Sequence, residues 1–381
     1  MTVTEQKKDG LEKITTELML QLLKEFFKQG INRNPQDPVS LAFFFDDHPY
    51  PLASTIVQML GSDSVQERDV IHLITMSIIS ELKADRENSH MVIINDATDL
   101  TKKIVERLCA PQEYHFSFPI SAGYGLSLSL DIGGAHNLKI QNLPTIEEQR
   151  VTLTGSVNAI HEFHASRQIE TDVKSVIGVS ISLGIAKLLP IPVDEIPAVI
   201  FPDRLVSRVH IDPMIGGLVT RIRFMVPNDL DELENKRLRS EPVTTALDHR
   251  LRGLNTVLSN NSERGKELRS AARLLFDAFA THEDGMAIAL AIMSMEAVLL
   301  DHKTSETVLA RLSEAVAYRV GKSADKRREL RKQVKRLYEA RSSFVHTGKV
   351  DKPSITVTEA RDICADVLRR EILDLDCMAE N

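Results

Sequence analysis

The chain has 381 residues, which is enough for two domains of ordinary size or for one large domain with a full core. Its apolar fraction of 43% and charged fraction of 27% are typical of a globular protein, and no run approaches the ~18 uninterrupted apolar residues of a membrane span. The N-terminal stretch MTVTEQKKDG lacks the apolar core of a signal peptide. We therefore expect a cytoplasmic protein without membrane association.

The formal net charge of −7 argues against a protein that coats nucleic acid over its whole surface. The charge is unevenly spread, because residues 322–349 hold ten Lys and Arg against three Asp and Glu. This gives a local charge of +7 and leaves −14 on the rest of the chain. One basic segment on an otherwise acidic protein indicates a localised anionic partner.

The first 240 residues alternate helical and β-rich patterns. Amphipathic helices are predicted over 11–29, which stops at Gly30, and over 66–83. Strands are predicted for the β-rich runs at 91–95, 114–118, 125–132, 149–157, 207–211 and 218–226. The mixture predicts an α+β domain over residues 1–240, and the pattern leaves its strand order open.

From Val243 onward nearly every segment has helical periodicity, and the β-rich runs disappear. The domain boundary is placed near Glu241. Helices are predicted over 243–259, 264–281, 284–302, 305–321, 324–346 and 357–374. The breaks between them supply Thr, Ser, Asp and Gly, which helix caps and turns require. Residues 241–381 are therefore predicted to form an all-α domain.

The other sequence motifs do not indicate a disulfide framework, a metal site or a cofactor site. Three cysteines are too few and too scattered for a disulfide framework or a zinc site. The motif HEFH at 161–164 has a spacing that a helix could use for a metal, but its neighbourhood leans towards strand, which would put the two histidines on opposite faces. Glycine pairs at 122–125, 132–135 and 215–218 are typical of turns. We expect no metal and no cofactor.

The predicted helix 324–346 has a recurring apolar stripe formed by Leu330, Val334, Leu337 and Val345. Arg341 falls on the same stripe, so its guanidinium is predicted to be buried. A buried charge requires a partner. Glu296, within the apolar run 286–300, is the predicted partner in a buried or interface ion pair. The alternative is a purely structural salt bridge.

His346 falls at the end of this helix, shortly before Gly348. Unpaired carbonyl groups at a helix end favour the protonated imidazole, which suits a proton donor or a phosphate ligand. Ser342 lies four residues earlier and therefore shares a helix face with His346. A histidine that only caps the helix end is the plainer alternative.

These residues together resemble the Apea-like branch of the HEPN superfamily. That pattern has an apolar helix with an internal glutamate, a helix of small and apolar residues, and a Tyr-x-x-Arg-Ser…His signature followed by glycine. Here the corresponding positions are Glu296, the helix 308–319, Tyr338, Arg341, Ser342, His346 and Gly348. Thr347 departs from the pattern, because many relatives have glycine directly after the histidine. The resemblance covers roughly residues 260–375.

The resemblance implies an all-α bundle that dimerises through the face carrying Arg341 and His346. It also implies one composite, metal-independent site that cleaves RNA. His346 would transfer a proton, Arg341 would stabilise the phosphate charge, and Ser342 would hold a phosphate oxygen or orient His346. Lys335, Arg336 and Lys349 would contact the RNA backbone. Tyr338 either packs, which we favour, or stacks on a base.

The sequence thus predicts a cytoplasmic homodimer, or a higher assembly of dimers, that acts as an endoribonuclease. The resemblance implies a defence or toxin effector, for example in antiviral defence, whose N-terminal domain senses an unknown trigger ligand or protein. One alternative is a non-catalytic HEPN module for dimerisation or partner binding. Another is an unrelated activity in the N-terminal domain, with the helical part serving only to oligomerise it.

Overall fold

The computed structural model describes residues 5–28, 50–61, 65–84, 97–122, 130–133, 138–144, 149–188, 222–224, 243–281, 283–300, 308–348 and 356–379. These residues fall into two compact units. The described residues up to Tyr114 and residues 157–168 form unit 1. The remaining described residues form unit 2. Among the described residues, no helix is long and apolar enough to cross a membrane.

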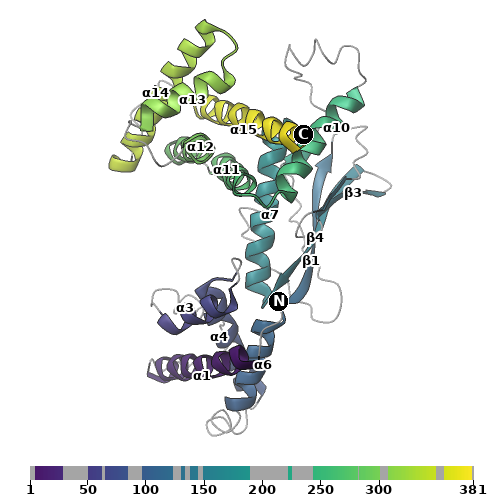
Figure 1. Ribbon diagram of the computed structural model, residues 1–381, viewed down its shortest axis with the longest axis vertical. Coiled ribbons are helices and arrows are strands. Elements are labelled where there is room, and N and C mark those ends of the chain that lie inside the picture. Colours follow the sequence, from purple (N-terminus) through teal and green to yellow (C-terminus); the bar gives the residue numbers. More distant parts are fainter. Residues whose placement is uncertain are drawn as a thin grey trace. The chain divides into compact units, whose positions relative to one another are not determined.

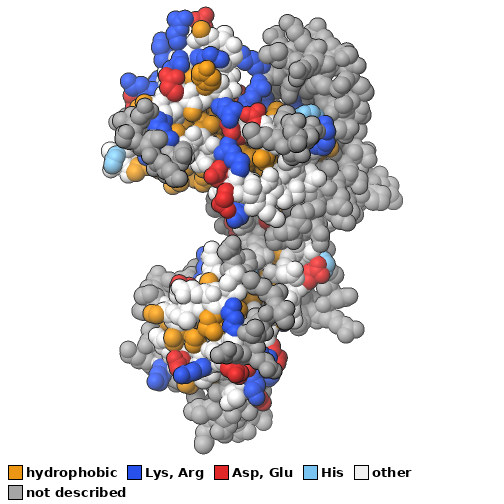
Figure 2. All heavy atoms as spheres, viewed as in Figure 1, with side chains coloured by type: hydrophobic (Ala, Val, Ile, Leu, Met, Phe, Trp, Pro, Cys, Tyr) orange, Lys and Arg blue, Asp and Glu red, His pale blue; other side chains and the backbone are white. Residues whose placement is uncertain are grey.

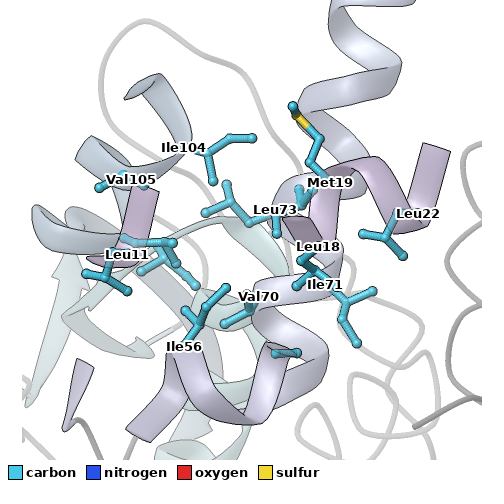
Figure 3. Packing of buried hydrophobic residues seen from close by; sticks show 14 of the residues in the cluster. Leu11, Leu18, Met19, Leu22, Ile56, Val70, Ile71, Leu73, Ile104 and Val105 are labelled. Carbon is cyan, nitrogen blue, oxygen red and sulfur yellow. The ribbon is translucent and has the colours of Figure 1, made fainter. Parts of the chain in front are cut away.

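Unit 1 is built from helices that enclose an apolar core (Figures 1 and 3). They are α1 (Glu5–Lys28), α3 (Pro51–Leu60), α4 (Glu67–Ala84) and α6 (Ala97–Cys109). The core side chains labelled in Figure 3 include Leu11 and Leu18 of α1 and Ile56 of α3, and all three are inaccessible to solvent. Helices α3 and α6 lie in segments for which the sequence predicted no element.

The histidines of the HEFH motif stand at the start of helix α7 (Glu162–Ser182), so the expectation of a strand was wrong there. His161 precedes the helix, and its Nδ1 accepts a hydrogen bond from the backbone N–H of His164 at 3.2 Å. Its Nε2 lies 2.7 Å from the carbonyl oxygen of Asp69. Burial, followed by the charge of His72, lowers the pKa of His161 to about 2. The neutral ring therefore acts as a helix cap.

Unit 2 contains a mixed sheet with strand order β2-β3-β4-β1-β6-β5. The strands are β1 (Gln112–Ala122), β2 (Leu130–Gly133), β3 (Leu138–Pro144), β4 (Gln149–Ala159), β5 (Ala186–Leu188) and β6 (Ile222–Phe224). Strands β3 and β4 are antiparallel, with Ile140 opposite Leu153, whereas β1 and β6 are parallel. Strands β3 and β5 were not predicted. The predicted strands at 91–95 and 207–211 lie outside the described residues.

The C-terminal part of unit 2 is entirely helical in its described residues, which confirms the expected all-α bundle. Its helices are α10 (Val243–Ser259), α11 (Glu263–Ala280), α12 (Asp284–Leu299), α13 (Val308–Val320), α14 (Ala324–Thr347) and α15 (Val357–Ala379). Capping side chains mark where two of these helices begin. Ser262 accepts from the N–H of Gly265, and Ser323 accepts from the N–H of Lys326.

Helix α12 is buried along most of its length and packs against α11, α13, α14 and α15 (Figure 1). Its one buried polar side chain, Ser294, donates a hydrogen bond to the carbonyl oxygen of Ala271 on α11 at 2.7 Å. A helix with apolar residues on nearly every side is stable only where other helices surround it. The rest of the bundle therefore packs around α12.

Helix α7 is tied to this bundle at its C-terminal end. Arg369 of α15 donates to the carbonyl oxygen of Ser182 at 3.0 Å, and Arg250 of α10 donates to that of Leu183. The last carbonyl groups of a helix have no hydrogen-bond partner within the helix, and these cationic side chains supply the missing donors. The sheet and most of α7 thus group with the C-terminal helices. The predicted division at residue 240 falls within a segment that lies outside the described residues.

The contact of α7 with α11 depends on Gly178, because a Cβ at this position would overlap the backbone carbonyl of Ala272. We predict that Gly178→Ala lowers the free energy of unfolding by about 1–3 kcal/mol, since the two helices would have to separate. Gly253→Ala is the control, because a Cβ there meets the Ile372 side chain at 3.3 Å. Higher helix propensity should keep its effect within about 1 kcal/mol.

Urea unfolding of both variants measures the difference. Equal stability of Gly178→Ala and the wild type would show that the close approach of α7 to α11 does not exist in solution.

Candidate active site at the end of helix α14

The predicted stripe on α14 is buried over its first part only. Leu330, Val334 and Leu337 are at most 2% exposed. Arg341 is half-buried, and the Val345 side chain is 56% exposed. The expectation that the stripe stays buried through Val345 was therefore wrong. The last turns of α14 extend beyond the bundle, so Arg341 lies at the boundary between the core and solvent.

Arg341 and Glu296 approach one another without forming the predicted close ion pair. No salt bridge within 4.0 Å joins them in the described structure, although they interact at longer range. The Arg341 guanidinium lies over the Tyr338 ring at 5.7 Å from its centroid. Its Nε is buried and has no hydrogen-bond partner within the described part of the chain. This Nε donor is therefore left unsatisfied within the described part of the chain.

Partial burial raises the pKa of the Glu296 carboxyl, and the charge of Arg341 offsets part of this rise. The carboxylate is held in an environment that disfavours its ionised form.

His346 is an exposed residue in the last turn of α14. The helix ends at Gly348, whose φ of 68° is left-handed and whose N–H donates to the carbonyl oxygen of Phe344 at 2.8 Å. This is the helix stop that the sequence predicted, and glycine adopts it without steric cost. Ser342 is half-buried one turn before His346. The two side chains therefore flank one side of the helix end.

Phe344 anchors this helix end to the core. A Cβ on Gly285, in the first turn of α12, would overlap the Phe344 ring, so the ring packs directly on the backbone of α12. The residues that follow in sequence, Met286 and Val345, are 40% and 56% exposed. Met293, two turns along α12 from Met286, is 43% exposed. Sequence reasoning missed both methionines, because the whole α12 run is apolar and its pattern does not mark an exposed side.

The cationic residues of α14 fall into two groups. Near its start, Arg331 forms a two-pronged pair with Glu314 of α13 at 2.7 Å for both contacts. Lys326 and Arg328 pair with carboxylates one turn away on their own helix. Figure 2 shows Lys and Arg side chains gathered over the region of α13 and α14. Such pairs are typical of a solvated face.

Nearer the motif, Lys335 is exposed, whereas Arg336 and Tyr338 are half-buried. The packing role expected for Tyr338 fits its contact with Arg341. Lys349 lies outside the described residues. The structure thus brings Arg341, Ser342, Tyr338 and His346 together at the end of one helix, with Glu296 on the helix packed beside it.

In the described part of the chain, no group of three or more His, Cys, Asp or Glu side chains could hold a metal ion. Comparison with known proteins adds no assignment, since no family model, curated protein or solved structure matches this chain.

The environment of Glu296 makes stability depend on pH in a defined direction. Because its pKa is raised by folding, the ionised carboxylate destabilises the folded state. We predict that Glu296→Gln matches the wild type in unfolding free energy below the ordinary glutamate pKa of about 4.3. It should become the more stable of the two as pH rises through and beyond the raised pKa.

Urea unfolding at pH 4 and pH 7 tests this. Glu339→Gln, which removes an exposed carboxylate of α14, is the matched control. A Glu296→Gln variant that is less stable than the wild type at pH 7 would mean that Arg341 and Glu296 form a strong pair after all.

Proposed function

We propose that this protein is a metal-independent endoribonuclease of HEPN type. The observation that carries the proposal is the end of α14, where an exposed histidine follows five residues after a half-buried arginine whose Nε has no hydrogen-bond partner among the described residues. The resemblance of the sequence to the Apea-like branch suggests the same residues. Arginine and histidine at one helix end supply positive charge and proton transfer, which are the two requirements of RNA cleavage by its own 2′-OH.

In the proposed reaction the 2′-oxygen attacks the adjacent phosphorus while the bond from phosphorus to the 5′-oxygen breaks. The proton of the 2′-OH passes to a base, and the leaving 5′-oxygen receives a proton from an acid. His346 would perform one or both transfers. Arg341 would donate its forked N–H groups to the equatorial phosphate oxygens. The products are a 2′,3′-cyclic phosphate and a 5′-OH, with no net change in oxidation state.

One chain offers one histidine at this site, whereas the reaction needs both a base and an acid. A second copy would supply the other imidazole. The exposed side chains of Met286, Met293 and Val345 support such an interface, because apolar groups of this size on neighbouring helices are stabilised when a partner covers them. A homodimer, or a higher assembly of dimers, would thus form one composite site.

The RNA backbone would reach the site along α14, past Lys335 and Arg336 and towards Lys349. Tyr338 either packs against Arg341 or stacks on a base. Residues 1–240 would restrain the nuclease until a trigger ligand or protein binds, because unrestrained cleavage of cellular RNA is harmful. A cytoplasmic effector in antiviral defence, or a toxin, fits this arrangement.

The alternative is a HEPN module that dimerises or binds a partner without catalysis. The exposed apolar side chains on α12 and α14 would serve this role equally well. A third candidate is an unrelated activity in residues 1–240. RNA cleavage assays separate the nuclease from both alternatives.

We predict that His346→Ala lowers the rate of RNA cleavage by at least about 100-fold, because it removes the proton-transfer group. Arg341→Lys should be similarly impaired, since lysine keeps the positive charge but lacks the forked N–H donors of the guanidinium group. His115→Ala removes an exposed histidine elsewhere in the chain and is the control. The assay digests labelled RNA and the matching DNA in excess EDTA, and mass spectrometry identifies the end groups.

Cleavage of RNA alone, with 2′,3′-cyclic phosphate ends, would support the mechanism. Equal cutting of DNA, loss of activity in EDTA, or a wild-type rate for His346→Ala would remove the helix end as the active site.

The composite site makes a separate prediction about assembly. Val345→Glu and Met293→Glu should each convert the dimer to a monomer, because a carboxylate would be buried without a partner at the interface. Leu20→Glu, at a side chain of α1 that is 45% exposed, is the control. Sedimentation at micromolar concentration measures the change. A wild-type chain that is monomeric at this concentration and fully active would exclude a site shared between two copies.

A further inference from the structure

A short turn joins helices α11 and α12, and an arginine from a third helix holds it. Helix α11 ends at Ala280, and α12 begins at Asp284. Helix α15 packs against both (Figure 1). Its Arg361 donates from Nε and Nη2 to the carbonyl oxygen of Ala278, at 2.9 and 2.6 Å. Nη2 also lies 3.4 Å from the carbonyl oxygen of Thr281. One side chain therefore fixes both the end of α11 and the first residue of the turn.

The surroundings of Arg361 hold its guanidinium in one orientation. The group lies over the Phe279 ring at 5.1 Å from the centroid. Burial lowers the pKa of Arg361, and the charge of Asp284, at the start of α12, offsets part of this fall. Ala278 is inaccessible to solvent. Loss of Arg361 would therefore leave a buried carbonyl group in need of another donor.

The turn passes this constraint on to the start of α12. The backbone N–H of Thr281 donates to the carbonyl oxygen of Asp277 at 3.0 Å, and its hydroxyl accepts from the N–H of Glu283 at 3.3 Å. The carbonyl oxygen of Glu283 accepts in turn from the N–H of Ala287, inside α12, at 2.9 Å. A series of hydrogen bonds thus runs from the end of α11 into the first turn of α12, where Gly285 lies.

The first turn of α12 determines where the last turn of α14 stands. The Phe344 ring packs so closely on Gly285 that a Cβ there would overlap it. The carbonyl oxygen of Phe344 accepts from the N–H of Gly348 at 2.8 Å. Phe344 is therefore fixed through both its ring and its backbone. His346 lies between Phe344 and Gly348 in the chain, so its position depends on the same contacts.

We propose that Arg361 is a positioning residue for the candidate active site and acts on His346 through the α11–α12 turn, Gly285 and Phe344. The inference rests on the proposed function. It assigns a role to α15, a helix that carries none of the residues named for the site. A displacement of a catalytic group by about 1 Å, caused by a change far from the chemistry, can lower a rate about 100-fold.

Hydrogen exchange followed by mass spectrometry measures this positioning and needs no RNA. In Arg361→Ala we expect the amides of residues 344–348 to exchange at least about tenfold faster than in the wild type, because the last turn of α14 opens more often. Phe344→Ala should have the same effect, whereas Phe344→Leu should retain most of the protection. If Arg361→Ala does not fold, Arg361→Lys replaces it and should give an intermediate rate, since lysine keeps the charge but lacks the forked donors.

Arg369→Ala is the matched control. Arg369 also lies on α15 and also donates to a carbonyl oxygen at a helix end, that of Ser182 at 3.0 Å. Its removal should lower the free energy of unfolding and leave the exchange of residues 344–348 at the wild-type rate. Wild-type exchange in Arg361→Ala, or an equal increase in Arg361→Ala and Arg369→Ala, would overturn the proposal.

RNA cleavage then separates positioning from substrate binding. Arg361→Ala should lower kcat at least about tenfold with little change in KM. The double variant with Phe344→Ala should be no slower than Phe344→Ala alone, because both residues act through one series of contacts. Faster exchange with an unchanged kcat, or multiplied effects in the double variant, would contradict the proposal. A wild-type chain that cleaves no RNA would instead refute the proposed function, and the exchange experiment would still report on the contacts.

Discussion

The burial of helix α12 is the constraint on which the C-terminal bundle depends. Most of its side chains are apolar, and it is covered by α11, α13, α14 and α15. Its single buried polar group, Ser294, is satisfied by the backbone of α11. Loss of any one of these covering helices would expose a strip of α12 to water, so the helices are held as one cooperative unit. This packing also determines which groups lie around Glu296 and Gly285.

The proposed active site lies where that burial ends. Gly285 lets the Phe344 ring pack directly on α12, which fixes the last turns of α14 although they extend beyond the bundle. Arg341 is consequently half-buried, whereas His346 and Val345 are exposed. A site at the edge of a rigid core combines positioned side chains with access for a large substrate. The same edge leaves apolar groups that a second copy would cover.

Much of this architecture could be predicted from the sequence. Helical periodicity located the helices of the bundle to within a few residues, because each has one clear apolar side or, for α12, a nearly continuous apolar run. The N-terminal part was harder. Helix α3 has only ten residues, and the start of α7 follows strand β4 so closely that the β-rich pattern appeared to continue through His161 and His164.

The environment of the candidate site could not be read from spacing alone. Periodicity placed Arg341 on the same stripe as Leu337. It could not show that the neighbouring helices leave Val345 uncovered. Nor could it give the separation of Arg341 from Glu296, which depends on how α12 and α14 pack.

Mixing wild-type and His346→Ala chains tests the central claim, that two copies of the α14 end form one RNA-cleaving site. After subunit exchange at constant total protein, a site that needs both histidines should lose activity as the square of the wild-type fraction. An equal mixture would then retain about one quarter of the initial cleavage rate. Retention of about one half would mean that each chain acts alone.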